Sequence, residues 1–134
     1  MKKRSFGYAA IYTIENKNGM VMEVSDFGAT LYALTVPDKT GKLIDVVLGF
    51  DSPEEYMAST TGFGATVGRN ANRIGNAAFT LNGKKYELAK NNGINNLHSG
   101  PDYYHYRMWE VKEVTDNSIT LSLHSPDGDQ VSVS

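Results

Sequence analysis

The sequence predicts an antiparallel all-β fold. The 134 residues contain 13 glycines and 4 prolines, and Val, Ile, Thr, Tyr and Phe recur in short runs between turn residues. That composition is typical of strands and turns. Asn-Gly pairs at 18–19 and 82–83 separate such runs, as they do in β-hairpins. No stretch of about 12 residues or more carries apolar side chains at helical spacing.

Four segments of the first half combine β-branched and aromatic residues and are predicted strands: residues 8–14, 20–24, 29–36 and 44–48. The first two form a hairpin around Asn18-Gly19. Pro37 ends the third strand, because proline cannot donate to a strand ladder. The turn over 38–41 then leads into the fourth strand.

One short helix is predicted after the fourth strand. Ser52 is a good cap, and Pro53 fits the first helical turn, where its missing N–H costs nothing. Residues 59–76 follow as a loop rich in glycine and polar side chains.

Four further strands are predicted in the second half: residues 79–81, 86–88, 109–114 and 119–123. They form two hairpins, the first around Asn82-Gly83 and the second around Asp116-Asn117. Residues 90–106 form a second long loop. The sequence has no internal repeat and no linker, so we expect a single domain over residues 1–134. Long loops in a short β domain are usually functional.

Composition excludes several classes of function. A formal charge of -2 argues against a nucleic-acid partner, and no apolar stretch approaches the roughly 20 residues of a membrane span. The absence of cysteine excludes disulfides, a thiol nucleophile and Cys-based metal sites. The basic residues 2–4 lead into no apolar segment, so no signal peptide is predicted. We therefore expect a cytoplasmic protein.

The first loop carries glycines at 62, 64 and 68, a spacing that is superficially like a dinucleotide fingerprint. No strand, glycine loop and helix surround it in that order, so nucleotide binding is not predicted.

Two arginines of the first loop are candidate site residues. Arg69 and Arg73 lie among glycines and asparagines and lead into apolar Ile74, which predicts partial burial. A buried guanidinium needs several oxygen acceptors. These are either backbone carbonyls, in a structural role, or the hydroxyls and ring oxygen of a sugar.

The second loop contains the strongest histidine candidate. His98 follows four asparagines in six residues, whose amides both donate and accept hydrogen bonds, and histidine is the residue type most often used for proton transfer near neutral pH. His105 lies in an aromatic run that either stacks on a sugar or covers the core, and His124 ends a predicted strand. Three histidines without ligand spacing predict no metal site. Asp127 and Asp129 are interpreted as a turn.

Several motifs, in one order along the chain, resemble the aldose 1-epimerase (galactose mutarotase) family. The sequence GATVGRNANRI at 64–74 resembles the family's signature. The other segments that share the resemblance are 27–31, 79–84, 91–93, 96–100, 107–111 and 125–129. The resemblance covers nearly the whole chain.

The resemblance implies an antiparallel β-sandwich of the galactose mutarotase-like (supersandwich) type that binds a free hexose such as galactose or glucose. The family interconverts α and β anomers without a cofactor. One group takes the proton of the C1 hydroxyl while another protonates the ring oxygen, and the ring opens. By resemblance, Arg73 and Asn72 bind substrate, and His98 is a catalytic and substrate-binding residue near the ring oxygen.

One departure concerns the C-terminal side. The family's second histidine, its sugar-binding aspartate and its glutamate base correspond to no position here, and the resemblance stops at Asp129. We therefore expect a truncated family member, inactive or nearly so by itself. The alternatives are a non-catalytic carbohydrate-binding β-domain and a structural sandwich without a ligand. A shortened sheet leaves edges and apolar faces bare, so a homodimer is expected.

Overall fold

The computed structural model describes residues 1–132, which form two compact units. The first unit comprises residues 1–66 and 105–123, and the second comprises residues 67–104 and 124–132. The single domain expected from the sequence stays a prediction. Within residues 1–132, no helix has the length and apolarity needed to cross a bilayer.

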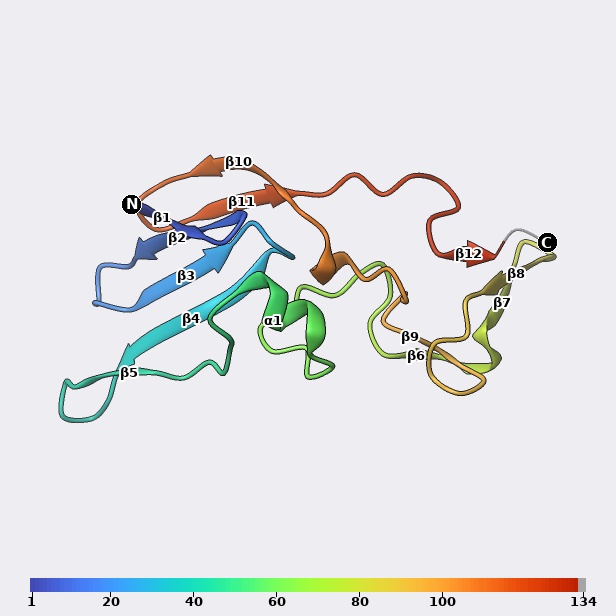
Figure 1. Ribbon diagram of the computed structural model, residues 1–134, viewed down its shortest axis with the longest axis horizontal. Coiled ribbons are helices and arrows are strands. Elements are labelled where there is room, and N and C mark those ends of the chain that lie inside the picture. The colour runs from blue at the N-terminus through green and yellow to red at the C-terminus, as the bar shows by residue number, and fades with distance from the viewer. Residues whose placement is uncertain (133–134) are drawn as a thin grey trace. The chain divides into compact units, whose positions relative to one another are not determined.

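The first unit is built on a five-stranded antiparallel sheet in which the strands follow one another in chain order (Figure 1). Its strands are β1 (Lys2–Phe6), β2 (Ala9–Glu15), β3 (Val21–Ser25), β4 (Thr30–Pro37) and β5 (Leu43–Asp45). A separate hairpin of the same unit contains β10 (Glu110–Val114) and β11 (Ile119–Ser122). The all-β antiparallel fold predicted from the sequence is confirmed.

The hairpins predicted from the turn signals are confirmed in this unit. β2 and β3 flank Asn18-Gly19, and β10 and β11 flank Asp116-Asn117. Two strands differ from prediction. β1 was not predicted, because four of its five side chains are exposed and polar, and β5 ends at Asp45 rather than continuing to Leu48.

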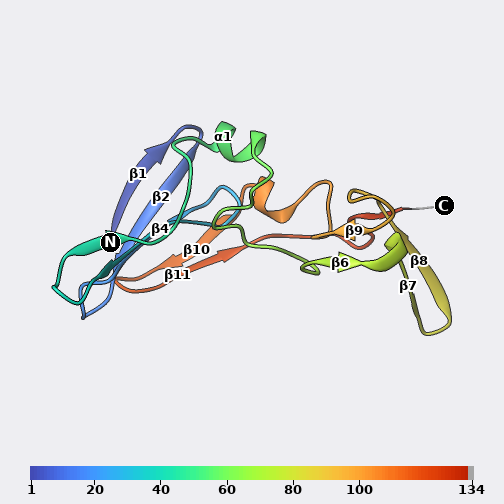
Figure 2. The same cartoon turned by 90° about the horizontal axis from the view of Figure 1, so that it is seen from below.

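The short helix α1 (Pro53–Ala58) closes one side of the core (Figure 2). Its cap is the predicted one, since the Ser52 hydroxyl accepts the Glu55 N–H at 3.2 Å. The helix places Tyr56 in a buried cluster with Phe6, Ile11 and Phe27. Burial of these side chains is the main stabilising contribution within the unit.

Tyr56 gives the first unit a predicted sensitivity to alkali. Its hydroxyl is buried without a hydrogen-bond partner among the described residues, and burial raises its pKa above the ordinary value of about 10. The nearby backbone of Phe50 lowers the pKa of Tyr56 and so offsets part of this rise. The folded chain therefore keeps this proton to higher pH than the unfolded chain. The resulting stability is complete below about pH 10 and falls as pH rises further.

We expect Tyr56→Phe to be as stable as the original chain at about pH 8, because it removes only an unpartnered hydroxyl. At about pH 11 it should be the more stable of the two. Urea unfolding at both pH values measures the difference, with Tyr86→Phe in the second unit as the matched control. An equal loss of stability in Tyr56→Phe and the original chain would contradict the prediction.

The second unit contains five short strands. They are β6 (Arg73–Ile74), β7 (Ala78–Leu81), β8 (Lys84–Leu88), β9 (Asn96–Leu97) and β12 (Val131–Ser132). β7 and β8 form the hairpin predicted around Asn82-Gly83, and β12 pairs with the free edge of β8. β6 pairs with β9, which joins the two long loops predicted from the sequence.

Candidate functional site

The β6–β9 ladder brings the two loops together at the predicted site residues. Arg73 lies opposite Leu97 and Ile74 opposite Asn96. One position further out, the His98 N–H donates to the Asn72 carbonyl at 2.9 Å. A pairing of only two residues on each strand therefore aligns the ends of both loops.

Four residues form a hydrogen-bonded group that we call the Arg73–His98 cluster: Asn72, Arg73, Asn92 and His98. Arg73 Nε donates to Asn92 Oδ1 at 2.8 Å, and its Nη1 donates to Asn72 Oδ1 at 3.3 Å. The Asn72 N–H donates to His98 Nδ1 at 2.9 Å. Asn72 thus contacts both Arg73 and His98, and the structure brings all three predicted residues together.

The predicted partial burial of the arginines is wrong. Arg73 and Arg69 are both exposed, because the loops that carry them lie at the surface of the second unit. His98 is half-buried. An exposed guanidinium beside a half-buried imidazole can donate hydrogen bonds to ligand oxygens without displacing packed side chains.

Two asparagines of the second loop stabilise the backbone of the loop that carries His98. Asn96 is 1% exposed, and its Nδ2 donates to the carbonyls of Ala89 at 2.8 Å and Gly100 at 3.0 Å. Asn91 Nδ2 donates to the Leu97 carbonyl at 2.8 Å, and its Oδ1 accepts the Leu97 N–H at 2.7 Å. Side chains here replace the backbone pairing that a regular strand would supply.

A second contact joins the loops next to His98. Ser99 Oγ accepts the Asn70 N–H at 3.0 Å and donates to the Asn70 carbonyl at 3.2 Å. The φ angles of Asn72, His98 and Ser99 are 64°, 54° and 55°, so all three are left-handed. This backbone is uncommon for residues other than glycine, and it aims the His98 ring toward Asn72.

Arg69 has a structural role and is not part of the Arg73–His98 cluster. Its Nη2 donates to the carbonyls of Ser125 at 3.2 Å and Pro126 at 2.7 Å, and to Ser125 Oγ at 2.8 Å. Its Nε donates to the Tyr104 hydroxyl at 3.2 Å. Of the two roles considered for the arginines, Arg69 has the structural one, because backbone carbonyls are among its acceptors. These hydrogen bonds connect its loop to residues 125–126.

Two glycines of the first loop are explained by close packing. A Cβ at Gly64 would lie 2.1 Å from the Leu31 carbonyl oxygen, and a Cβ at Gly68 would lie 2.6 Å from the Tyr104 ring. Gly64 and Gly68 therefore reflect steric need, and within residues 1–132 no α-helix follows them to build a nucleotide site.

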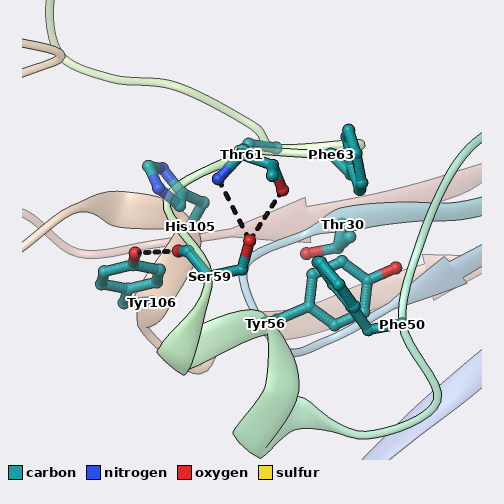
Figure 3. Close-up of a pocket in the computed structure, with 10 residues that line it drawn as sticks. Thr30, Phe50, Tyr56, Ser59, Thr61, Phe63, His105 and Tyr106 are labelled. Atoms are coloured by element: carbon teal, nitrogen blue, oxygen red, sulfur yellow. Dashed lines mark hydrogen bonds between the residues drawn. The ribbon is translucent and has the colours of Figure 1, made fainter.

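The aromatic run that contains His105 covers the core, as one of its two alternatives predicted. Tyr106 packs against the buried cluster of the first unit and donates to the Ser59 carbonyl at 2.9 Å. Figure 3 shows these residues around a cavity with Tyr56 and Thr61. Its volume of about 10 Å³ is enough for one water and far too small for a hexose.

The remaining candidates form no site in the described chain. Asp127 and Asp129 lie in a turn closed by the bond from the Asp129 N–H to the Pro126 carbonyl at 3.2 Å, as predicted. His124 is exposed. Within residues 1–132, no three His, Asp or Glu side chains gather as metal ligands would.

The sequence did not predict Asn92 or Ser99 as site residues. Asn92 holds Arg73, and Ser99 holds the backbone beside His98. The density of asparagine in the second loop signalled amide partners in general. Which amide meets which group depends on the β6–β9 pairing, and this non-local contact leaves no local pattern in the sequence.

Comparison with known proteins identifies the family of the chain. A family model described as aldose 1-epimerase matches residues 10–131. The chain is 38% identical over 120 residues to the aldose 1-epimerase of Escherichia coli (strain K12), which covers 90% of this chain and 35% of that protein. It is 45% identical over 109 residues to the galactose mutarotase of Bos taurus, covering 81% and 32%.

Two solved structures of aldose epimerases have a similar fold. The GalM/aldose epimerase homologue from C. elegans superposes with a TM-score of 0.84 at 42% identity, over 91% of this chain and 38% of that one. Galactose 1-epimerase from Lactobacillus acidophilus NCFM gives a TM-score of 0.76 at 27% identity, over 96% and 39%. The chain thus has a galactose mutarotase-like fold and spans about a third of the length of these relatives. It belongs to the aldose 1-epimerase family.

Proposed function

We propose that this chain is part of an aldose 1-epimerase and binds a free hexose, such as galactose or glucose, through Arg73, Asn72 and His98. The observation that carries the proposal is the Arg73–His98 cluster, in which Asn72 contacts both other residues. Guanidinium, amide and imidazole groups together donate and accept hydrogen bonds, which suits the many hydroxyls of a sugar. Family membership supports the same ligand class.

The chemistry of the family needs two proton transfers. A base takes the C1 hydroxyl proton, an acid protonates the ring oxygen, and rotation about C1–C2 followed by closure gives the other anomer. Of the acid–base groups implied by the resemblance, these 134 residues contain only His98. Each missing group costs about 10²–10⁴-fold in rate. The 134-residue polypeptide alone is therefore inactive or nearly so.

Polarimetry of freshly dissolved α-galactose tests this claim. We expect mutarotation with the 134-residue chain to be no faster than in buffer. A rate above buffer that disappears in His98→Ala would contradict the expected inactivity and would identify a working enzyme.

The alternative is a non-catalytic carbohydrate-binding β-domain. The composition of the Arg73–His98 cluster favours it, since the four side chains include two amides and no carboxylate to serve as a base. Saturable galactose binding without any rate above buffer fits both the alternative and the catalytically incomplete epimerase. Mixing the chain with the remaining portion of a relative separates them, because only an epimerase fragment gains activity.

We also propose that the chain is cytoplasmic and forms a homodimer. The two edges of the five-stranded sheet differ. β1 carries Lys2, Lys3 and Arg4, which discourage edge pairing, whereas β5 and the residues just after it are mostly apolar, apart from Asp45. The exposed apolar residues there are Leu43, Ile44, Val46 and Leu48. A second copy that pairs at this edge would cover them.

Light scattering at micromolar concentration measures the oligomeric state. We expect a dimer for the original chain and a monomer for Val46→Lys, which adds a charge at the apolar edge. Met57→Lys is the matched control, because Met57 is similarly exposed but lies on α1, and it should leave the dimer intact. A monomeric mass for the original chain would contradict the dimer.

A further inference from the structure

The main chain of Asn72 holds the ring of His98. The Asn72 N–H donates to His98 Nδ1 at 2.9 Å, and the His98 N–H donates back to the Asn72 carbonyl at 2.9 Å. The two residues thus form a closed pair with left-handed φ angles of 64° and 54°. The neighbouring contact between Ser99 and Asn70 fixes the same two chain segments on the other side of His98.

This geometry decides where the proton of the neutral ring lies. A backbone N–H can only donate, so Nδ1 must offer its lone pair to Asn72. A neutral imidazole carries a single N–H, and with Nδ1 as acceptor that proton is on Nε2. The ring therefore presents a donor, and no lone pair, at its outer nitrogen.

We propose that the main-chain N–H of Asn72 is a positioning group that fixes neutral His98 as the Nε2–H tautomer. Toward a sugar, His98 is then a hydrogen-bond donor to an oxygen and not the base that removes a hydroxyl proton. A neutral ring that donates in this way polarises the oxygen without transferring its proton. The role toward a sugar rests on the proposed function, whereas the tautomer does not.

The tautomer can be measured on the unmodified chain without any ligand. In a sample with ¹⁵N-labelled imidazoles at about pH 8.5, above the ordinary histidine pKa of about 6.5, long-range ¹H–¹⁵N spectra report each ring nitrogen separately. We expect a protonated-type shift for Nε2 of His98 and an unprotonated-type shift for Nδ1. A scalar coupling across the hydrogen bond, from the Asn72 amide nitrogen to Nδ1, is also expected.

Exposed His124 is the internal control and should show shifts averaged over both tautomers. A proton on Nδ1 of His98, or averaging equal to that of His124, would overturn the assignment. Absence of the coupling to Asn72 would overturn the positioning role.

Two substitutions separate donor from base in sugar binding. His98→Gln places an amide near the position of Nε2 and can still donate, whereas His98→Asn reaches only the position of Nδ1. We expect His98→Gln to bind galactose within about threefold of the original chain. His98→Asn should lose about tenfold, as the loss of one hydrogen bond to a ligand implies. His124→Gln and His124→Asn are the matched controls and should change nothing.

The outcomes are distinguishable. Equal losses in His98→Gln and His98→Asn would overturn the donor role. Failure of the original chain to bind galactose would overturn the proposed function, while the nitrogen shifts would still decide the tautomer.

Discussion

Arg73→Ala is expected to weaken galactose binding by about 10- to 100-fold. A hydrogen bond from a charged group contributes about 1.5–3 kcal/mol, and each 1.4 kcal/mol is a factor of ten in affinity. Arg73 is exposed, and among the described residues its guanidinium donates to the side chains of Asn72 and Asn92, both at the surface or half-buried, so its removal leaves no buried group unpaired. The fold should therefore survive, and NMR titration with galactose measures the affinity.

Arg4→Ala is the matched control for this variant. Arg4 is also an exposed arginine; it donates to Glu23 and lies over the Tyr32 ring, but it is on β1 in the first unit. Its replacement should leave galactose affinity unchanged. Equal affinities of Arg73→Ala and Arg4→Ala would contradict a sugar-binding role for Arg73.

The largest expected loss of stability comes from Asn96. Asn96→Leu keeps the approximate volume of the side chain but leaves two carbonyls unsatisfied, that of half-buried Ala89 and that of buried Gly100. Each buried unsatisfied group costs about 1–3 kcal/mol, so we expect a total of about 3 kcal/mol. The loop that positions His98 should open as a consequence.

Amide hydrogen exchange over residues 89–100 measures this opening directly. Protection should fall by about 100-fold in Asn96→Leu, which corresponds to about 3 kcal/mol. Asn70→Ala is the control, because the exposed Asn70 side chain makes no hydrogen bond with any described residue. If Asn96→Leu kept full protection, Asn96 would not be the support of this loop.

The elements that could be predicted are those whose signal is local. Asn18-Gly19 and Asn82-Gly83 specify tight hairpin turns, and Ser52 ahead of Pro53 specifies a helix start. In each case a few adjacent residues determine the backbone geometry. The structure reproduces these elements to within one or two residues.

The elements that were missed depend on distant partners. β1 has polar, exposed side chains and is a strand only because β2 offers its edge. β6 and β9 contain two residues each, too few for any alternating pattern. Their pairing across more than twenty residues is set by tertiary contacts, which a local pattern does not encode.

The candidate site was predicted at the level of residues but not of partners. Chemistry and resemblance selected Asn72, Arg73 and His98, and the structure joins them through hydrogen bonds. The sequence could not assign Asn92 to Arg73. It left open which acceptors Arg69 uses, and the structure gives it the carbonyls of residues 125–126. Those pairings follow from loop conformation, including the left-handed backbone at His98.

The central claim is that Arg73 and His98 form one wall of a hexose site. It is tested most directly by titrating the unmodified chain with galactose while the Arg73 guanidinium and His98 imidazole signals are followed by NMR. We expect saturable shifts at both residues, together with Asn72, and none at Tyr106 in the aromatic cavity of the first unit. Signals of Arg73 and His98 that stay unmoved at saturating galactose would contradict the claim.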